Sequence, residues 1–198
     1  MIRAGHVREV TRTAGEWVFV DVGFARDARS CGLLVGEGDA CEVTFAEVVR
    51  RVSEVASGQG RPMHLLIEAP LSVAFTAAGN PTGRTVERRG RETRYWYVGL
   101  GCGVLMSAMY LLHGVVATRP RREVRLFEGF ASFKSRETGS SHARDVLRLR
   151  EVVWEPPRHP GAIVPPEELA IEPSDLLSSA FRVAGMDFGV PPVVRIDG

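Results

Sequence analysis

The pattern of apolar and polar positions predicts several short strands. Residues 17–22 form a short apolar run rich in β-branched and aromatic residues, which is typical of a strand buried on both faces, and residues 63–67 predict a second buried strand. Residues 31–35 follow a polar stretch and are expected to pair with the first run as a hairpin, with a third short strand near Cys41. Residues 123–127 predict one more strand.

The pattern also predicts two amphipathic helices. Residues 44–57 carry one apolar stripe, begin with Thr44 and Glu47 at capping-box spacing, and can end at Gly58. Residues 141–153 show a second helical stripe. Because helices alternate with the later strands, the pattern indicates parallel pairing and a layered α/β domain.

One long segment has no charge. Residues 95–118 contain no Asp, Glu, Lys or Arg and are long enough to span a bilayer. Four glycines interrupt the segment, however, and its most hydrophobic part, residues 104–112, is only a few turns long. We therefore expect a buried core helix, no membrane insertion and, since the N-terminus resembles no signal peptide, a cytoplasmic protein.

The last part of the chain differs in composition. Residues 155–198 hold eight of the twelve prolines and a net charge of −4, against +5 for the preceding 154 residues. A last helix is predicted over residues 175–184, with Ser174 as N-cap and Gly185 as its stop. We interpret residues 1–198 as a single domain to which this proline-rich, acidic region contributes its final helix.

The composition and the cysteine spacing exclude several classes of protein and of functional site. With 44 % hydrophobic and 25 % charged residues the chain falls in the ordinary globular range, and its net charge of +1 points to no particular partner. Cys31, Cys41 and Cys102 lack C-x-x-C spacing, which argues against a zinc site or a disulfide framework. No G-x-S-x-G sequence indicates a serine nucleophile.

Carboxylates directly follow two apolar strands. Asp21 ends one and Glu68 ends the other, and a carboxylate beside a core is costly unless it is paired or binds a cation. Ligands collect at the carboxyl ends of strands in α/β sheets. These acids therefore predict a Mg²⁺ or Mn²⁺ site, for which Glu172 and Asp175 offer further ligands at helical spacing.

Four short motifs carry a family resemblance. In order they are VFVDVGFA, HLLIEAPLS, RLFEGFASF and EPSDLLSSAF. They resemble the ribonuclease H-like nucleases, most closely the Holliday-junction resolvase branch and related uncharacterised predicted nucleases. The resemblance implies a mixed sheet of about five strands flanked by helices. It also implies that Asp21, Glu68 and Asp175 are the catalytic acids of the first strand, the fourth strand and the last helix.

The resemblance implies further ligands and leaves one choice open. Glu172 matches a second acid or His of the resolvase branch, and Glu128 matches a fifth-strand Glu of the predicted nucleases. SHARDVLRL offers a competing H-x-x-D through His142 and Asp145. Asp175 is preferred because resolvase-like chains place one more helix, here residues 141–153, before the helix that bears the acid.

The expected activity is two-metal hydrolysis of a phosphodiester in DNA or RNA, by a monomer or a homodimer. Asp21 would bridge both ions, Glu68 and Asp175 would each hold one, and Gly23 would let the phosphate approach the backbone. The alternatives are an inactive ribonuclease H-like module that binds nucleic acid or a protein, and a phosphotransferase.

A basic loop completes the prediction. Residues 76–94 are rich in arginine, and the aromatic residues that follow could stack on bases. The expected nucleic-acid contacts are Arg84, Arg88, Arg89, Arg91 and Trp96, with Tyr95 beside them. A solvated connection without a ligand is the alternative.

Overall fold

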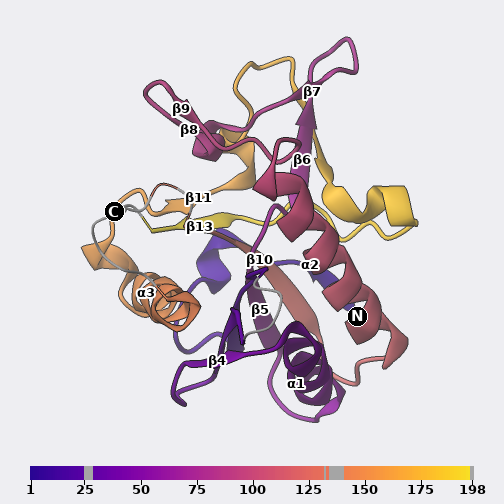
Figure 1. Cartoon of the computed structure of the whole chain (residues 1–198), viewed down its shortest axis with the longest axis vertical. Coiled ribbons are helices and arrows are strands. Elements are labelled where there is room, and N and C mark those ends of the chain that lie inside the picture. The colour runs from indigo at the N-terminus through magenta and orange to yellow at the C-terminus, as the bar shows by residue number, and fades with distance from the viewer. Residues whose placement is uncertain (25–28, 132, 134–140, 197–198) are drawn as a thin grey trace.

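A computed structural model describes residues 1–24, 29–131, 133 and 141–196. Its centre is an eight-stranded sheet with the order β11-β13-β10-β5-β2-β3-β4, to which β1 adds beside β10 (Figure 1). The strands are β1 (Ile2–Ala4), β2 (Glu16–Asp21), β3 (Cys31–Val35), β4 (Cys41–Val43), β5 (Met63–Glu68), β10 (Val124–Phe130), β11 (Ile163–Val164) and β13 (Val193–Arg195). The α/β class and the mixed sheet are confirmed, but the sheet is larger than the expected five strands.

The strand directions follow from the connections. β2, β3 and β4 form an antiparallel meander, whereas β5 is parallel to β2 and β10 is parallel to β5. β1 and β13 share one edge of β10: β1 pairs along its first residues and β13 along its last. The three strands of this sheet that are missing from the prediction, β1, β11 and β13, are only two or three residues long and carry too few positions to show a period.

Three helices cover the two faces of the sheet. Successive side chains of β2 point to opposite faces of the sheet. Val18 and Val20 pack toward helices α1 (Phe45–Ser57) and α2 (Leu100–Ala117). Trp17 and Phe19 point to the opposite face, where α3 (His142–Trp154) packs (Figure 1). The central strands are therefore buried on both faces, as their continuous apolar sequences predict.

The caps define where two of the helices begin. The Thr44 side chain accepts a hydrogen bond from the Glu47 amide at the start of α1, and Gly58 ends that helix. The Ser141 side chain accepts one from the Arg144 amide at the start of α3. Both helices match their predicted ranges closely because local signals and the apolar stripe agree.

Helix α2 is longer and less buried than expected. Ala108, Leu111, Leu112 and Val115 are buried against the sheet and α1. On the other side of the helix, Met106 and Tyr110 are exposed. By length and composition α2 could cross a membrane, and 22 % of its apolar 18-residue window is buried. Only one side of α2 is therefore buried, as expected for a core helix, and its other side is exposed.

A smaller sheet and a hairpin stand beyond the carboxyl end of β5. The smaller sheet has the order β12-β6-β7, with β6 (Ser72–Phe75), β7 (Pro81–Thr82) and β12 (Leu176–Ser179); the hairpin joins β8 (Arg88–Arg89) to β9 (Glu92–Thr93) (Figure 1). Part of the basic segment is therefore ordered as strands and a 3₁₀ helix over Thr85–Glu87.

The predicted last helix is wrong. Leu176–Ser179 is strand β12, which pairs antiparallel with β6, and only Ala180–Ala184 is helical, as a 3₁₀ helix. Gly185 ends that turn with φ of +73°, so the stop signal was interpreted correctly. Pairing with the edge of β6, which is distant in sequence, overrides the local helical pattern.

Candidate metal centre

Asp21 and Glu68 lie side by side at one edge of the sheet. They are the last residues of β2 and β5, and the parallel register pairs them directly. Both point to the face on which α3 packs, since each lies an even number of positions after a residue of that core, Phe19 or Leu66. Asp21 is buried and Glu68 half-buried, with Glu68 Oε1 accepting a 3.2 Å hydrogen bond from the Ala131 amide.

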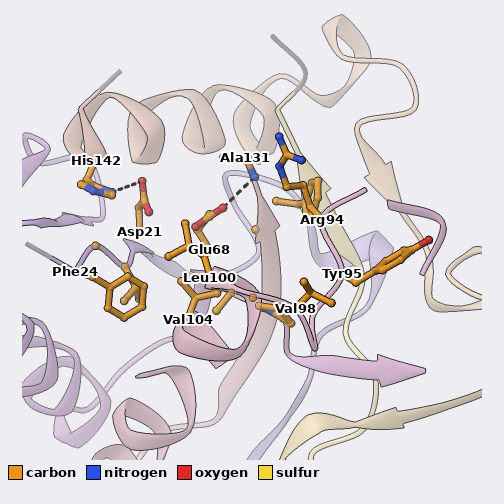
Figure 2. A pocket seen from close by; sticks show the side chains of 17 residues that line it. Asp21, Phe24, Glu68, Arg94, Tyr95, Val98, Leu100, Val104, Ala131 and His142 are labelled. Carbon is orange, nitrogen blue, oxygen red and sulfur yellow. Dashed lines mark hydrogen bonds and ion pairs between the residues drawn. The ribbon is translucent and has the colours of Figure 1, made fainter. Parts of the chain in front are cut away.

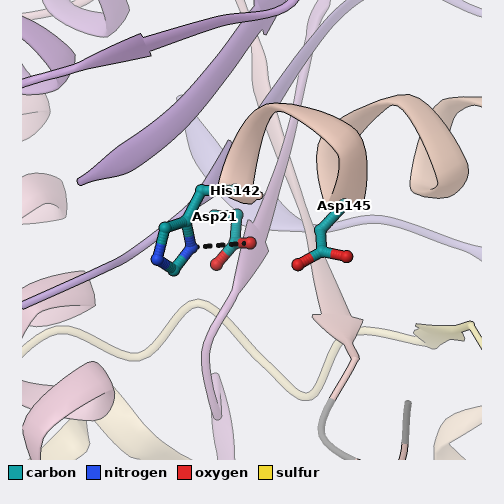
Figure 3. A group of neighbouring side chains, drawn as sticks. All are labelled: Asp21, His142 and Asp145. Carbon is teal, nitrogen blue, oxygen red and sulfur yellow. Dashed lines mark ion pairs between the residues drawn. The ribbon is translucent and has the colours of Figure 1, made fainter. Parts of the chain in front are cut away.

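The first turn of α3 brings two more polar side chains to Asp21. His142 and Asp145 are three residues apart in this turn and so face the same way. Asp145 is fully buried, and the amino end of the helix favours its negative charge. His142 Nδ1 lies 2.9 Å from Asp21 Oδ2 (Figure 3).

Two glycines allow α3 to begin so close to the sheet. A Cβ on Gly32 would lie 2.2 Å from the His142 carbonyl oxygen, and one on Gly23 would lie 2.5 Å from His142 Nε2 and 1.9 Å from the Ser30 carbonyl oxygen. Gly32 is the register partner of Asp21 on β3. Both glycines thus provide space for His142, so Gly23 has a packing role in addition to the phosphate approach that we expected.

The three side chains form a compact donor set. Asp21, His142 and Asp145 each offer one ligand atom, and these atoms all lie within 4.8 Å of one another (Figure 3). Two nearly buried carboxylates at this separation repel each other unless a cation or a proton lies between them. Two carboxylates and one imidazole are suitable ligands for a divalent metal ion.

Two members of the donor set, Asp21 and His142, line a cleft of about 560 Å³. Asp21, Glu68 and His142 line one part of the cleft, and Arg94 and Tyr95 lie on the far side of Glu68 (Figure 2). Between them the wall is apolar and consists mainly of Phe24, Val98, Leu100 and Val104. The cleft thus combines an acidic end, an apolar wall and a cationic end.

Glu128, which we expected as an additional ligand, belongs to a separate buried cluster. Its register partner on β5 is Ile67, so its side chain points to the face opposite Glu68. Glu128 Oε2 accepts hydrogen bonds from the Arg84 guanidinium at 2.7 Å and from the Leu71 amide at 2.8 Å. This prediction is corrected: Glu128 neutralises a buried arginine.

Arg84 cannot contact nucleic acid because it is fully buried. Its guanidinium also bonds Glu87 and the Ser72 hydroxyl. Burial alone would disfavour the charged form, but the attraction of Glu128 and Glu87 raises the pKa of Arg84 above its ordinary value. The cluster ties the basic segment to β10.

Asp175 and Glu172 lie away from the metal centre. Asp175 comes just before β12, and its Oδ2 accepts a 3.1 Å hydrogen bond from the Glu172 amide. Neither residue lines the cleft or belongs to the donor set. Asp175 is remote because β12 joins the smaller sheet, whereas Asp145, the competing choice, lies in the centre.

Of the other predicted contacts, all of which are described by the structure, Tyr95 alone lines the cleft. Arg88, Arg89 and Arg91 are exposed on the β8–β9 hairpin. Trp96 is held in place by a 2.9 Å hydrogen bond from its indole to the Thr82 carbonyl oxygen. Its ring also packs edge-on against Phe75, which indicates a structural role. Arg94, absent from our expected set, lines the cleft with Tyr95.

No protein-family model matches this chain, and no curated protein or solved structure matches it either.

Proposed function

We propose that the protein is a metal-dependent nuclease with a ribonuclease H-like sheet, whose metal ligands are Asp21, Asp145, His142 and Glu68. One observation carries the proposal. The first turn of α3 meets Asp21, although 120 residues separate them in sequence, at the strand edge where Asp21 and Glu68 are register partners. Nothing in the folding of an apolar core requires three ionisable side chains at this point.

Each residue has a role that its position supports. Asp21 lies between its neighbours His142 and Glu68 and is the natural shared ligand. Asp145, buried in the first helical turn, supplies a second carboxylate of fixed direction. A divalent cation held by these groups would supply an activated water and charge compensation for a phosphate. Arg94 offers a guanidinium for a neighbouring phosphate.

The ligand types in the donor set also favour some metal ions over others. Carboxylates suit Mg²⁺ and Mn²⁺, whereas an imidazole ligand disfavours Mg²⁺ relative to softer ions. We therefore propose that Mn²⁺ supports activity better than Mg²⁺.

The test is cleavage of labelled single-stranded, duplex, hybrid and four-way-junction substrates with either metal. Asp21→Asn and Asp145→Asn should lower the rate at least about 100-fold, because each removes a charged ligand. Asp175→Asn, a matched change at an acid outside the centre, should leave the rate unaltered.

Three outcomes would count against the proposal. Cleavage that persists in both centre variants would remove these residues from the mechanism. Loss of activity in Asp175→Asn would restore the alternative third acid. If wild-type protein cuts none of the substrates with either metal, the non-catalytic binding module becomes the better interpretation.

A further inference from the structure

The middle of the cleft is apolar and accessible. Phe24, Val98 and Leu100 have exposed fractions of 51 %, 57 % and 77 %, although all three line the cleft. Large apolar side chains gathered at such exposure beside ionisable groups are typical of a ligand site. The proposed phosphodiester chemistry uses the acidic end and Arg94, so the apolar wall between them requires an explanation of its own.

The wall is built from two segments that the fold brings together. Phe24 follows Asp21 by three residues, and its ring lies over the first turn of α2, where a Cβ on Gly103 would be 3.3 Å from the Phe24 ring. Val98 and Leu100 lie at the start of α2 and face the same cleft (Figure 2). An apolar surface is thus placed directly beside the metal centre.

The acidic and cationic ends of the cleft indicate which kind of ligand it binds. The acidic end is suited to a metal-bound phosphate, and Arg94 is the one arginine or lysine among the described residues that line the cleft. Tyr95 lies next to Arg94 and adds an aromatic ring. A nucleotide within a strand has a phosphate on either side of its sugar, and the base that projects from this sugar has an apolar face.

We propose that the cleft binds a single-stranded segment of nucleic acid, with one unpaired base against Phe24, Val98 and Leu100 beside the phosphate at the metal centre. This inference rests on the proposed function for the identity of that phosphate. In a duplex the faces of the bases are covered by stacking, and exposing one costs free energy. An unpaired base offers its face without that cost, and base stacking on aromatic side chains is tolerant of sequence.

The electrostatics of the cleft agree with this substrate class. Proteins that bind a duplex through its backbone neutralise many phosphates with Lys and Arg. Here the chain carries a net charge of +1, and the described part of the cleft contains one arginine. Base contacts, rather than many phosphate contacts, must then supply much of the affinity.

The test measures binding without cleavage. Fluorescence anisotropy with Mn²⁺ would compare a labelled single-stranded oligonucleotide, its duplex and the same backbone without bases, all on the Asp21→Asn protein. We expect the single strand to bind at least about 10-fold more tightly than either of the others. A free mononucleotide should compete at least about 100-fold more weakly than the oligonucleotide, because it lacks the second phosphate.

A matched pair of variants locates the base. Val98→Ser and Phe24→Ala should each weaken single-strand binding at least about five-fold and leave binding of the base-free backbone unchanged. Val183→Ser makes the same change at a valine that is 84 % exposed outside the cleft, and should have no effect. Because the substituted side chains are exposed, thermal melting should confirm that all variants fold.

Several outcomes would overturn the inference. These are equal binding of duplex and single strand, equal binding of the base-free backbone, tight binding of a free mononucleotide, and no difference between Val98→Ser and Val183→Ser. Because binding is measured on a cleavage-deficient protein, its failure would leave the cleavage assay untouched. Single-strand binding by a wild-type protein that cuts nothing would support this inference and remove the proposed function.

Discussion

His142 Nδ1 lies 2.9 Å from Asp21 Oδ2, and this contact joins the first turn of α3 to the end of β2. It places Asp145 beside Asp21 as well, since His142 and Asp145 are three residues apart on one helix. The candidate centre therefore depends on how closely α3 approaches the sheet.

The centre should bind Mn²⁺ and be stabilised by it. Ligand at about 100 times its Kd stabilises a fold by about 2.7 kcal/mol, which for a chain of this size raises Tm by roughly 5–10 °C. Asp145→Asn should lose most of this rise, and Asp175→Asn should keep it. Melting curves with and without Mn²⁺ measure both, and an equal rise in the two variants would contradict the ligand assignment.

Glycine 32 should be essential for the approach of α3. In Gly32→Ala the new Cβ would meet the His142 carbonyl oxygen, so the helix must shift and we expect a loss of about 1–3 kcal/mol in unfolding free energy, together with weaker Mn²⁺ binding. Gly114→Ala is the control. Its Cβ would meet only the end of the Val49 side chain, at 3.0 Å, and alanine favours the helix by about 1 kcal/mol. Urea unfolding of both variants, with Mn²⁺ titrations, tests this.

The buried cluster around Arg84 should be highly sensitive to loss of its cation. Arg84→Met leaves Glu87 and Glu128 buried without their partner, and we expect a cost of about 3–5 kcal/mol. Arg91→Ala, in the exposed turn of the β8–β9 hairpin, should change the unfolding free energy by less than about 0.5 kcal/mol. Denaturant unfolding would contradict this account if the two variants were equally stable.

A single histidine should make stability depend on pH between 6.5 and 4. His64 is fully buried between Trp17 and Phe127, and this burial, with the nearby Arg125 guanidinium, lowers the pKa of His64 from 6.5 to about 4. As pH falls through this range the unfolded chain takes up a proton that the folded chain does not. The contribution is complete above pH 6.5, and about 2 kcal/mol of it is lost between pH 7 and pH 5.

The control for this prediction is His64→Gln, which keeps a hydrogen-bond acceptor for Arg125 but cannot titrate. Its stability should change less than that of the wild type between pH 7 and pH 5, as measured by urea unfolding. The pKa of Glu9 is lowered to about 2, against its own burial, by hydrogen bonds from Arg3 and the His6 amide. Its contribution is lost only below about pH 4.5, so it does not affect the comparison between pH 7 and pH 5.

Much of the sheet was predictable because its central strands are buried on both faces. Continuous apolar runs marked β2 and β5, and the carboxylates that end them were recognised as a pair at one edge. The short strands β1, β11 and β13 were missed because two or three residues show no period. The positions of Asp21 and Glu68 could therefore be predicted from the local sequence.

The rest of the site depended on long-range packing. Two segments offered an acid near a predicted helix start, and local signals at Asp175 and Asp145 were equally good. What distinguishes them is that residues 176–179 pair with β6, while Gly32 and Gly23 make room for α3 beside Asp21. The burial of Arg84 was equally hidden, because its partner Glu128 is 44 residues away.

The shared edge of β10 has a consequence for how the protein is made. During synthesis β10 emerges from the ribosome long before β13, the strand that covers its last three residues. Until Val193–Arg195 have been translated, this part of β10 presents unpaired backbone groups to other chains. A ribosome stalled before residue 193 would thus hold a chain that is prone to aggregation, because the sheet cannot be completed.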